Sequence, residues 1–124
     1  MESSQINDGN MLITGGSGVI GSYITELLKD EFDIVVADIA RPQANVKYVN
    51  VDLTKPFTLS KDFEICIHLA AHVGGIQHLT RYPVENIRDN PTMTANVLDA
   101  SVNSNLNHII YTSNQNNINN FDLF

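Results

Sequence analysis

What this 124-residue sequence lacks narrows the class of protein to which it can belong. It has one cysteine, Cys66, which cannot form an internal disulfide and fits a reducing compartment. No run of apolar residues approaches the roughly 18 that a membrane span needs. The first residues, Met1–Asn10, are polar and do not resemble a signal peptide. The sequence therefore predicts a cytoplasmic protein with no membrane partner.

Positive charge is also scarce. The chain has 7 Lys and Arg residues against 14 Asp and Glu residues, which gives a formal net charge of −7. The basic residues are scattered between Lys29 and Arg88, and none lies beyond Arg88. Because an acidic chain repels phosphate backbones, we expect no nucleic-acid partner.

Short apolar runs alternate along the chain with helical patterns. The strand-like runs are Met11–Thr14, Asp33–Asp38, Val46–Asp52, Ile65–Leu69 and His108–Ser113. Helical spacing covers Ser17–Lys29 and Val84–Ser104. This alternation predicts an α/β fold, a Rossmann-type doubly wound parallel sheet of five strands in the order 3-2-1-4-5, truncated after strand five.

The predicted nucleotide-binding domain covers residues 11–113. Before it, Met1–Asn10 is expected to be a disordered lead. After it, residues 114–124 are expected to form a tail, since five of the seven residues Asn114–Asn120 are asparagine. Within the domain, Thr54–Phe63 offers only a weak helical turn.

Each predicted helix has an apolar stripe. In the first helix the stripe consists of Ile20, Ile24, Leu27 and Leu28. In the second it consists of Val84, Ile87, Pro91, Ala95, Leu98 and Val102. Asn90-Pro91 is either a cap at a helix start or a kink. Met93, Val97 and Ala100 lie off the stripe and form either an exposed dimer face or more of the core. The core is the favoured interpretation, and an oligomer stays open.

A glycine-rich loop joins the first strand to the first helix. Thr14–Gly21 contains G-x-G-x-x-G as Gly16, Gly18 and Gly21, and G-x-x-G-x-x-G as Gly15, Gly18 and Gly21. A dinucleotide loop needs a tight turn, a bare backbone beside the pyrophosphate, and close packing of helix on strand. The helix N-terminus then supplies N–H groups and a partial positive charge for the anion. The alternative is a glycine-rich turn that binds nothing.

Two acidic residues follow neighbouring strands at positions suited to a nucleotide. Asp38 lies 22 residues beyond Gly16, where its carboxylate can accept hydrogen bonds from ribose hydroxyls and repel a 2′-phosphate. That charge favours NAD over NADP, although Arg41 could weaken the preference and Asp38 could instead only cap a loop. Asp52-Leu53 follows the third strand, where Asp52 could accept a bond from the adenine amino group.

Together these residues resemble a known family. Thr14–Gly21, Asp38, Asp52-Leu53 and His68-Leu-Ala-Ala71 are similar to the extended short-chain dehydrogenase/reductases, the NAD-dependent nucleotide-sugar epimerases and dehydratases. Within that family, His68–Ile76, Arg81–Glu85 and Asn96–Ala100 look most like GDP-L-fucose synthases. The resemblance covers residues 11–113, the N-terminal part of a longer family chain.

The resemblance implies an NAD cofactor, with NADP as the alternative. It implies cofactor contacts from Gly15, Gly18, Val19, Ile20, Gly21, Asp38, Asp52, Leu53, Leu69, Ala70, Ala71 and Asn90. Of these, Asn90 is equally well explained as a helix cap.

The family's catalytic Tyr-x-x-x-Lys pair is absent from the sequence. The residues four positions after the four tyrosines are Leu27, Asp52, Asn86 and Gln115. The family's catalytic Ser/Thr falls on Ser113 or Asn114 depending on the alignment, and the substrate domain is missing, so we assign no catalytic residue.

The resemblance thus implies the NAD-binding portion of a nucleotide-sugar epimerase, dehydratase or reductase, inactive alone, with a separate chain as the candidate carrier of the substrate domain. The alternatives are a non-catalytic nucleotide-binding module and a degenerate remnant that acts through protein contacts.

The histidines and the cysteine suggest no further chemistry. No metal site is predicted from His68, His72, His78 and His108, because the segment with the first two is strand and loop and lacks a suitably spaced acidic ligand. Cys66, in the middle of the fourth strand, is expected to be a small buried hydrophobe.

Overall fold

A five-stranded, fully parallel sheet forms the centre of the computed structural model, which describes residues 4–70 and 83–112. Its strands are β2 (Met11–Thr14), β3 (Ile34–Asp38), β4 (Lys47–Asn50), β6 (Ile65–His68) and β7 (His108–Tyr111). Their spatial order is β4-β3-β2-β6-β7. Counted along the chain this is 3-2-1-4-5, so the predicted Rossmann-type topology is confirmed.

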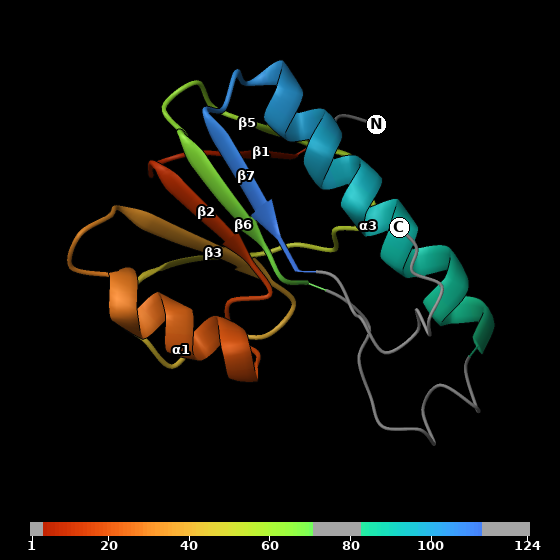
Figure 1. Cartoon of the computed structure of the whole chain (residues 1–124), viewed down its shortest axis with the longest axis horizontal. Helices are drawn as coiled ribbons and strands as arrows, with labels where there is room; N and C mark the ends of the chain where they lie inside the picture. Colours follow the sequence, from red (N-terminus) through yellow and green to blue (C-terminus); the bar gives the residue numbers. More distant parts are fainter. Residues whose placement is uncertain (1–3, 71–82, 113–124) are drawn as a thin grey trace, which may run out of the picture.

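Two helices lie on opposite faces of this sheet (Figure 1). They are α1 (Val19–Leu28) and α3 (Pro83–Asn103). The α1 face carries Ile13 and Val36, and the α3 face carries Leu12 and Cys66. Successive residues of a strand point to opposite faces, so a run such as Met11–Thr14, buried throughout, needs cover on both sides. Within residues 4–70 and 83–112, no helix is both long and apolar enough to cross a membrane.

The predicted inward stripe of α1 is partly wrong. Ile20 and Leu27 are 61% and 59% exposed, while the fully buried residues of this helix are Gly21 and Thr25. The cause is the glycine loop: Gly21 lies against the backbone of Gly15, so the helix turns its small residues toward the sheet. Hydrophobic spacing alone does not reveal such a close approach.

The α3 stripe is corrected in the same way. Met93, Val97 and Ala100 are buried in the core between helix and sheet, as favoured, and are not an exposed dimer face. Leu98 and Val102, members of the predicted stripe, are exposed. The helix has two apolar sides, and only the position of the sheet decides which is covered. It also runs continuously through Pro91, so Asn90-Pro91 does not begin it.

A second, two-stranded parallel sheet was not predicted. β1 (Ser4–Ile6) pairs with β5 (Phe57–Leu59), and Ile6, Phe57 and Leu59 are buried beside α3. The expected disordered lead is therefore wrong for residues 4–6, and the weak helical turn is replaced by a strand. Phe57–Leu59 does alternate buried, exposed, buried, but its partner lies about fifty residues away, beyond the reach of local pattern.

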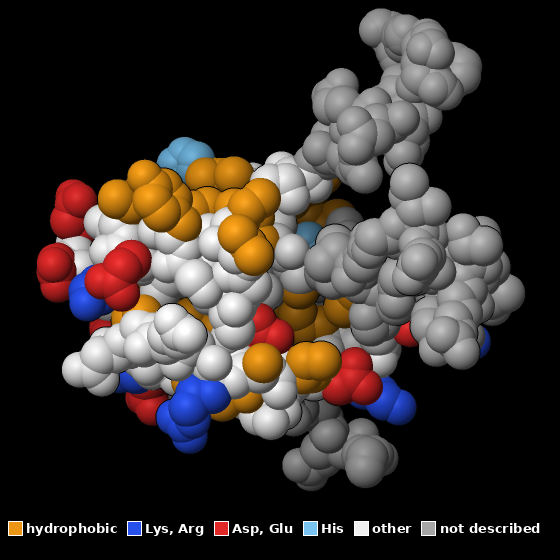
Figure 2. All heavy atoms as spheres, turned by 90° about the horizontal axis from the view of Figure 1, so that it is seen from below, with side chains coloured by type: hydrophobic (Ala, Val, Ile, Leu, Met, Phe, Trp, Pro, Cys, Tyr) orange, Lys and Arg blue, Asp and Glu red, His pale blue; other side chains and the backbone are white. Residues whose placement is uncertain are grey.

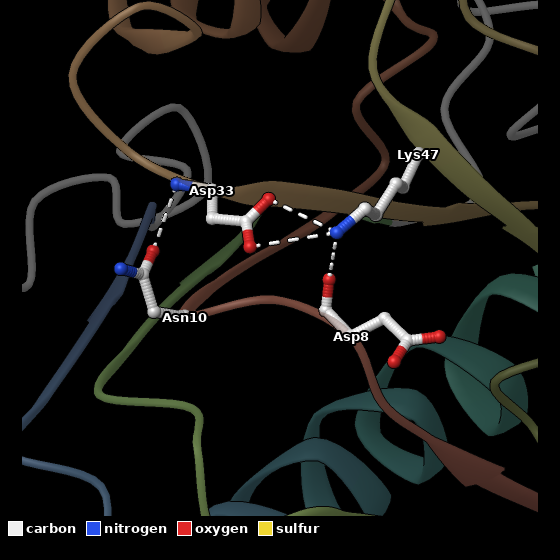
Figure 3. Close-up of polar contacts among 4 residues, drawn as sticks. All are labelled: Asp8, Asn10, Asp33 and Lys47. Atoms are coloured by element: carbon white, nitrogen blue, oxygen red, sulfur yellow. Dashed lines mark hydrogen bonds and ion pairs between the residues drawn. The ribbon is translucent and has the colours of Figure 1, made fainter.

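The amino end of the sheet is fastened by a small polar cluster (Figure 3). The Lys47 ammonium lies 3.2 Å from an oxygen of Asp33 and also donates to the carbonyl of Asp8. The Asp33 N–H donates to the side-chain oxygen of Asn10 at 2.9 Å. These contacts connect the N-terminal residues to the starts of β3 and β4.

Candidate functional site

A cleft of about 500 Å³ lies at the carboxyl ends of the strands. Ligand sites in open α/β sheets occur at this end, and pockets of this size suit small molecules. In Figure 2, which views the molecule from below Figure 1, hydrophobic and acidic side chains are visible in a hollow near the middle of the face. The lining residues are Gly15, Ser17, Gly18, Asp38, Ile39, Ala40, Val51, Asp52, Leu53, Thr54, Leu69, Ala70, Asp89 and Met93.

Two glycines of the loop are required by the fold itself. Gly15 has φ +72°, and a Cβ there would lie 2.7 Å from the backbone nitrogen of Ala70. A Cβ at Gly21 would lie 2.1 Å from the carbonyl oxygen of Gly15. Both contacts are with backbone atoms, so no side-chain movement could relieve them. The absence of a side chain at these two positions is what allows the loop, α1 and the residues after β6 to pack so closely.

Gly18 is different. A Cβ there would meet only the carbonyl oxygen of Gly15, at an ordinary 3.5 Å, and its φ of −77° is open to any residue. Gly18 is also exposed and lines the cleft. The protein does not need a glycine here for its own packing, whereas a ligand lying against the backbone would.

Gly18 is also the N-cap of α1, and it provides no side-chain cap. The first turn of the helix has no acidic residue, so its N–H groups are not neutralised by a carboxylate of their own helix. Uncapped first-turn N–H groups and the helix dipole together attract an anion. The helix end bordering the cleft is therefore suited to a phosphate.

Asp38, at the end of β3, holds the loop and the following turn together. Its Oδ2 accepts the N–H of Ser17 at 3.0 Å, and its Oδ1 accepts the N–H groups of Ile39 and Ala40 at 2.7 and 3.3 Å. The Ser17 hydroxyl in turn donates to the carbonyl of Ala40 at 2.6 Å. Asp38 therefore does cap a loop, and it also lines the cleft. A carboxylate has about four acceptor positions, so three N–H bonds leave room for another donor.

Asp52 and its neighbours form the wall that follows β4. The Thr54 hydroxyl and N–H donate to one oxygen of Asp52, at 2.6 and 3.0 Å. These bonds, the hydroxyl first, lower the pKa of the Asp52 carboxyl, so it stays ionised. The side-chain N–H of Asn96, on α3, donates to the carbonyl of Leu53 at 2.8 Å. Helix α3 thus fixes this wall from behind.

The structure brings most of the residues expected to contact a cofactor into this cleft. Gly15, Gly18, Asp38, Asp52, Leu53, Leu69 and Ala70 line it. Val19, Ile20 and Gly21 are not part of this lining. The side chains of Val19 and Ile20 are largely exposed, and Gly21 is buried under the loop. Asn90 is outside the lining although Asp89 is in it, and Ala71 lies outside the described residues, as does Ser113.

Sequence reasoning missed several lining residues. They are Ser17, Ile39, Ala40, Val51, Thr54, Asp89 and Met93. Ser17 and Thr54 carried a usable signal, since a hydroxyl beside a predicted phosphate loop and an Asp-x-Thr after a strand both favour local capping. Met93 carried none, because its role depends on where α3 crosses the sheet. Arg41 lies 5.3 Å over the ring of Tyr48 and is absent from the lining.

The remaining predictions concern Cys66 and a metal site. Cys66 is fully buried, as expected, and burial raises the pKa of its thiol to about 12. Among residues 4–70 and 83–112, no three His, Cys, Asp or Glu side chains are grouped as metal ligands. His72 and His78 are not among the described residues.

Comparison with known proteins now identifies the family. Residues 11–117 match the model of the NAD dependent epimerase/dehydratase family. The chain belongs to this family. A putative UDP-glucose 4-epimerase of Methanocaldococcus jannaschii is 28% identical over 116 residues, which is 83% of this chain and 37% of that protein.

Solved structures share the fold of this chain. MoeE5 in complex with UDP-glucose and NAD is 27% identical with a TM-score of 0.68, covering 85% of this chain and 36% of MoeE5. TunA, an NAD-dependent NDP-hexosamine 5,6-dehydratase, has a TM-score of 0.76 at 20% identity, covering 94% of this chain and 40% of TunA. The chain thus spans about two fifths of the length of these relatives.

Proposed function

We propose that this chain binds NAD in the cleft at the carboxyl ends of β2, β3 and β4. The observation that carries the proposal is the convergence of three features in that cleft: the Gly15–Gly18 turn at an uncapped helix start, Asp38, and the Asp52–Thr54 wall. Family membership and a relative solved with NAD support it. Bound NAD would supply hydride transfer, and the protein would supply its orientation.

Each part of the cleft suits a different part of a dinucleotide. The pyrophosphate suits the α1 N-terminus, where backbone N–H groups border the cleft and Gly18 leaves clearance. The adenosine ribose suits Asp38, whose carboxylate has acceptor capacity beyond its three N–H bonds. The adenine suits the wall of Asp52, Leu53 and Thr54, which offers an ionised carboxylate beside apolar surface.

The charge of the cleft favours NAD over NADP. Its described lining includes the carboxylates of Asp38, Asp52 and Asp89 and no Lys or Arg. Arg41, the basic residue nearest to Asp38 in sequence, is held over Tyr48. Arg88 lies outside this lining and pairs with Asp89 at 3.0 Å, so the charges of Asp38 and Asp52 are the ones that an additional 2′-phosphate would meet.

We further propose that the chain binds its cofactor without turnover. No tyrosine of the 124 residues is followed four positions later by lysine, so the family's proton-transferring pair is not supplied by this sequence. Catalysis would then require that pair and a substrate domain from outside these 124 residues, for which a separate chain is one candidate. The substrate class is a nucleotide sugar, as in MoeE5. The sequence resemblance favours GDP-L-fucose synthases, whereas these relatives act on or bind UDP-sugars.

Isothermal titration calorimetry with NAD and with NADP tests the proposal. The purified chain should bind NAD more tightly than NADP by about tenfold or more, a difference of about 1.4 kcal/mol. Gly18→Ala should leave the fold unchanged by circular dichroism but weaken NAD binding at least about tenfold, because the new Cβ stands where the pyrophosphate needs bare backbone. Asp38→Asn should reduce the preference for NAD.

The same titrations distinguish the other interpretations. If NAD binds and neither UDP- nor GDP-sugars are converted, a nucleotide-binding module or the cofactor half of a two-chain enzyme is supported. If a folded chain binds neither dinucleotide, the cofactor proposal is wrong and a degenerate remnant is favoured. A Gly18→Ala variant that binds NAD as well as the native chain would exclude the glycine loop as the pyrophosphate site.

A further inference from the structure

Three polar side chains are joined beneath the cleft, at the junction of β2, β6 and α3. Thr14 and His68, which end β2 and β6, are 0% and 6% exposed. Thr14 Oγ1 lies 2.6 Å from His68 Nδ1, and His68 Nε2 lies 3.2 Å from Thr94 Oγ1 on α3. Thr94 is half-buried. We refer to Thr14, His68 and Thr94 as the buried triad, after its two buried members.

The hydrogen bonds of Thr14 fix the protonation of His68. Thr14 Oγ1 accepts the N–H of Ala70 at 3.1 Å and, at 3.0 Å, the N–H of Leu69, which is shared with the backbone carbonyl of Thr14. A hydroxyl has one proton and two acceptor positions, so with both positions filled its proton must go to His68 Nδ1. Nδ1 therefore carries no proton, and the N–H at Nε2 donates to Thr94. The neutral Nε2–H form of the imidazole satisfies every one of these contacts.

The buried triad holds the backbone that forms one wall of the cleft. Leu69 and Ala70 line the cleft directly. The turn at Gly15 packs on the same backbone, since a Cβ at Gly15 would lie only 2.7 Å from the nitrogen of Ala70. A change in the Thr14 hydroxyl would therefore move both Ala70 and the glycine loop. His68 is not among the residues that line the cleft, so it acts on the cleft wall through Thr14.

We propose that His68 is a positioning residue for the dinucleotide, whose neutral imidazole keeps Thr14 turned to hold Leu69, Ala70 and the Gly15 turn in the binding arrangement. This inference rests on the proposed NAD site. Protonation of Nδ1 would place an N–H against an oxygen whose acceptor positions are already filled. Thr14 Oγ1 would then have to give up one of its two amide donors. Leu69 would keep its bond to the Thr14 carbonyl, whereas Ala70 would lose the bond that holds it, and the cleft wall would loosen.

The surroundings of His68 favour the neutral form at physiological pH. The ionisable side chains described on the elements packed against it are His108 and Tyr111 of β7, and Arg88, Asp89 and Asp99 of α3. Tyr111 is its partner in the register of β7, and His108 and Asp99 are exposed. β2 contributes none. Burial lowers the pKa of the His68 imidazole. NAD binding should therefore be intact near neutral pH and should weaken as the pH falls below about 6.5, through the lowered pKa of His68.

Titration of the full chain with NAD between about pH 5 and pH 8 tests this role, because unperturbed carboxyl groups titrate below that range. His68→Asn keeps an acceptor near the position of Nδ1 but does not titrate. It should bind NAD within about threefold of the native chain at pH 7.5 and lose the acid dependence. His68→Leu removes the acceptor and should bind at least about tenfold more weakly at every pH.

Matched controls separate the role of His68 from general effects. His72, His78 and His108 remain in His68→Asn, so a flattened profile assigns the titration to His68. His108→Asn changes an exposed histidine of β7 and should keep the native profile. If His68→Leu fails to fold, the native profile and that of His68→Asn still decide the question.

The imidazole can also be observed without any ligand. Nitrogen-15 NMR of the native chain should show His68 as the neutral Nε2–H tautomer at pH 7. An Nδ1–H tautomer or a charged ring would overturn the inference. A native chain that binds NAD with the same acid profile as His68→Asn would overturn it while leaving the proposed function intact. A native chain that binds no NAD would overturn both, because the positioning role presupposes the site.

Discussion

The two ends of the five-stranded sheet are built differently. At the amino end the carbonyls of Asn10, Asp33 and Glu64 each accept two N–H groups from the start of a neighbouring segment, and Lys47 adds an ion pair. At the carboxyl end the strands stop at a cleft of about 500 Å³ beside an uncapped helix start. The polar groups at the amino end bond to one another and hold the strands together. The first-turn N–H groups of α1 at the carboxyl end have no side-chain cap and are available to a ligand.

The two ends also differ in what their side chains contribute. The amino-end cluster uses an exposed lysine and aspartate, whose interaction is weakened by water and salt. The carboxyl end uses the close backbone contacts of Gly15 and Gly21 and the buried side chains of Thr14 and His68, where an added atom has no room. Substitutions at the packed positions of the carboxyl end should therefore cost more than substitutions at the amino end.

Gly21→Ala should have the largest effect on stability. Its Cβ would lie 2.1 Å from the carbonyl oxygen of Gly15 and 2.8 Å from Gly16 Cα, so the helix must move away from the loop. We expect a loss of about 3 kcal/mol in the free energy of unfolding, measured by urea denaturation. Gly18→Ala is the matched control and should lower that free energy by no more than about 1 kcal/mol, because alanine is a poorer helix N-cap than glycine. Equal costs at the two glycines would remove the distinction between fold and ligand positions.

Asn96→Ala should have the next largest effect. The substitution leaves the Leu53 carbonyl without its bond from α3, at a cost of about 1–2 kcal/mol in the free energy of unfolding. Because Leu53 lines the cleft, NAD affinity should fall with it in calorimetric titration. Asp99→Ala, at an exposed position of the same helix, should change neither quantity. An unchanged affinity in Asn96→Ala would show that α3 does not control this wall.

Lys47→Ala should have the smallest effect. The ion pair with Asp33 is exposed, so we expect a loss of less than about 1 kcal/mol in urea denaturation. The loss should shrink further in about 1 M salt, where charges are screened within about 3 Å. Lys55→Ala, at an exposed position outside the cluster, is the control. NAD affinity should be unchanged, and a large drop would contradict the separation of the two ends.

The residues that the sequence predicted well are those whose role depends on neighbours in the chain. The order of the five strands follows from alternating patterns and right-handed crossovers. The glycine loop and Asp38 lie at the expected ends of β2 and β3 because motif, strand and helix are contiguous. From such local signals twelve cofactor contacts were predicted, and seven of these residues line the cleft.

The residues that were missed or misplaced depend on distant partners. Ile6 is buried because β1 pairs with β5. Met93 lines the cleft because of where α3 packs against the sheet. The exposed positions of Ile20 and Leu98 follow from how each helix is rotated against the sheet, which spacing does not specify. Thr94 joins His68 across 26 residues, a separation that no local pattern encodes.

The sequence by itself determined the strand order, the phosphate-type loop and the acid that follows the second strand. It could do so because period-two and helical patterns, glycines and a strand-end carboxylate act over a few residues of chain. Only the tertiary structure decided which helix faces are buried, how the first residues pair, and that His68 lies within hydrogen-bond distance of two threonines. Those outcomes depend on packing and hydrogen bonds between segments far apart in the sequence, whose geometry exists only once the chain has folded.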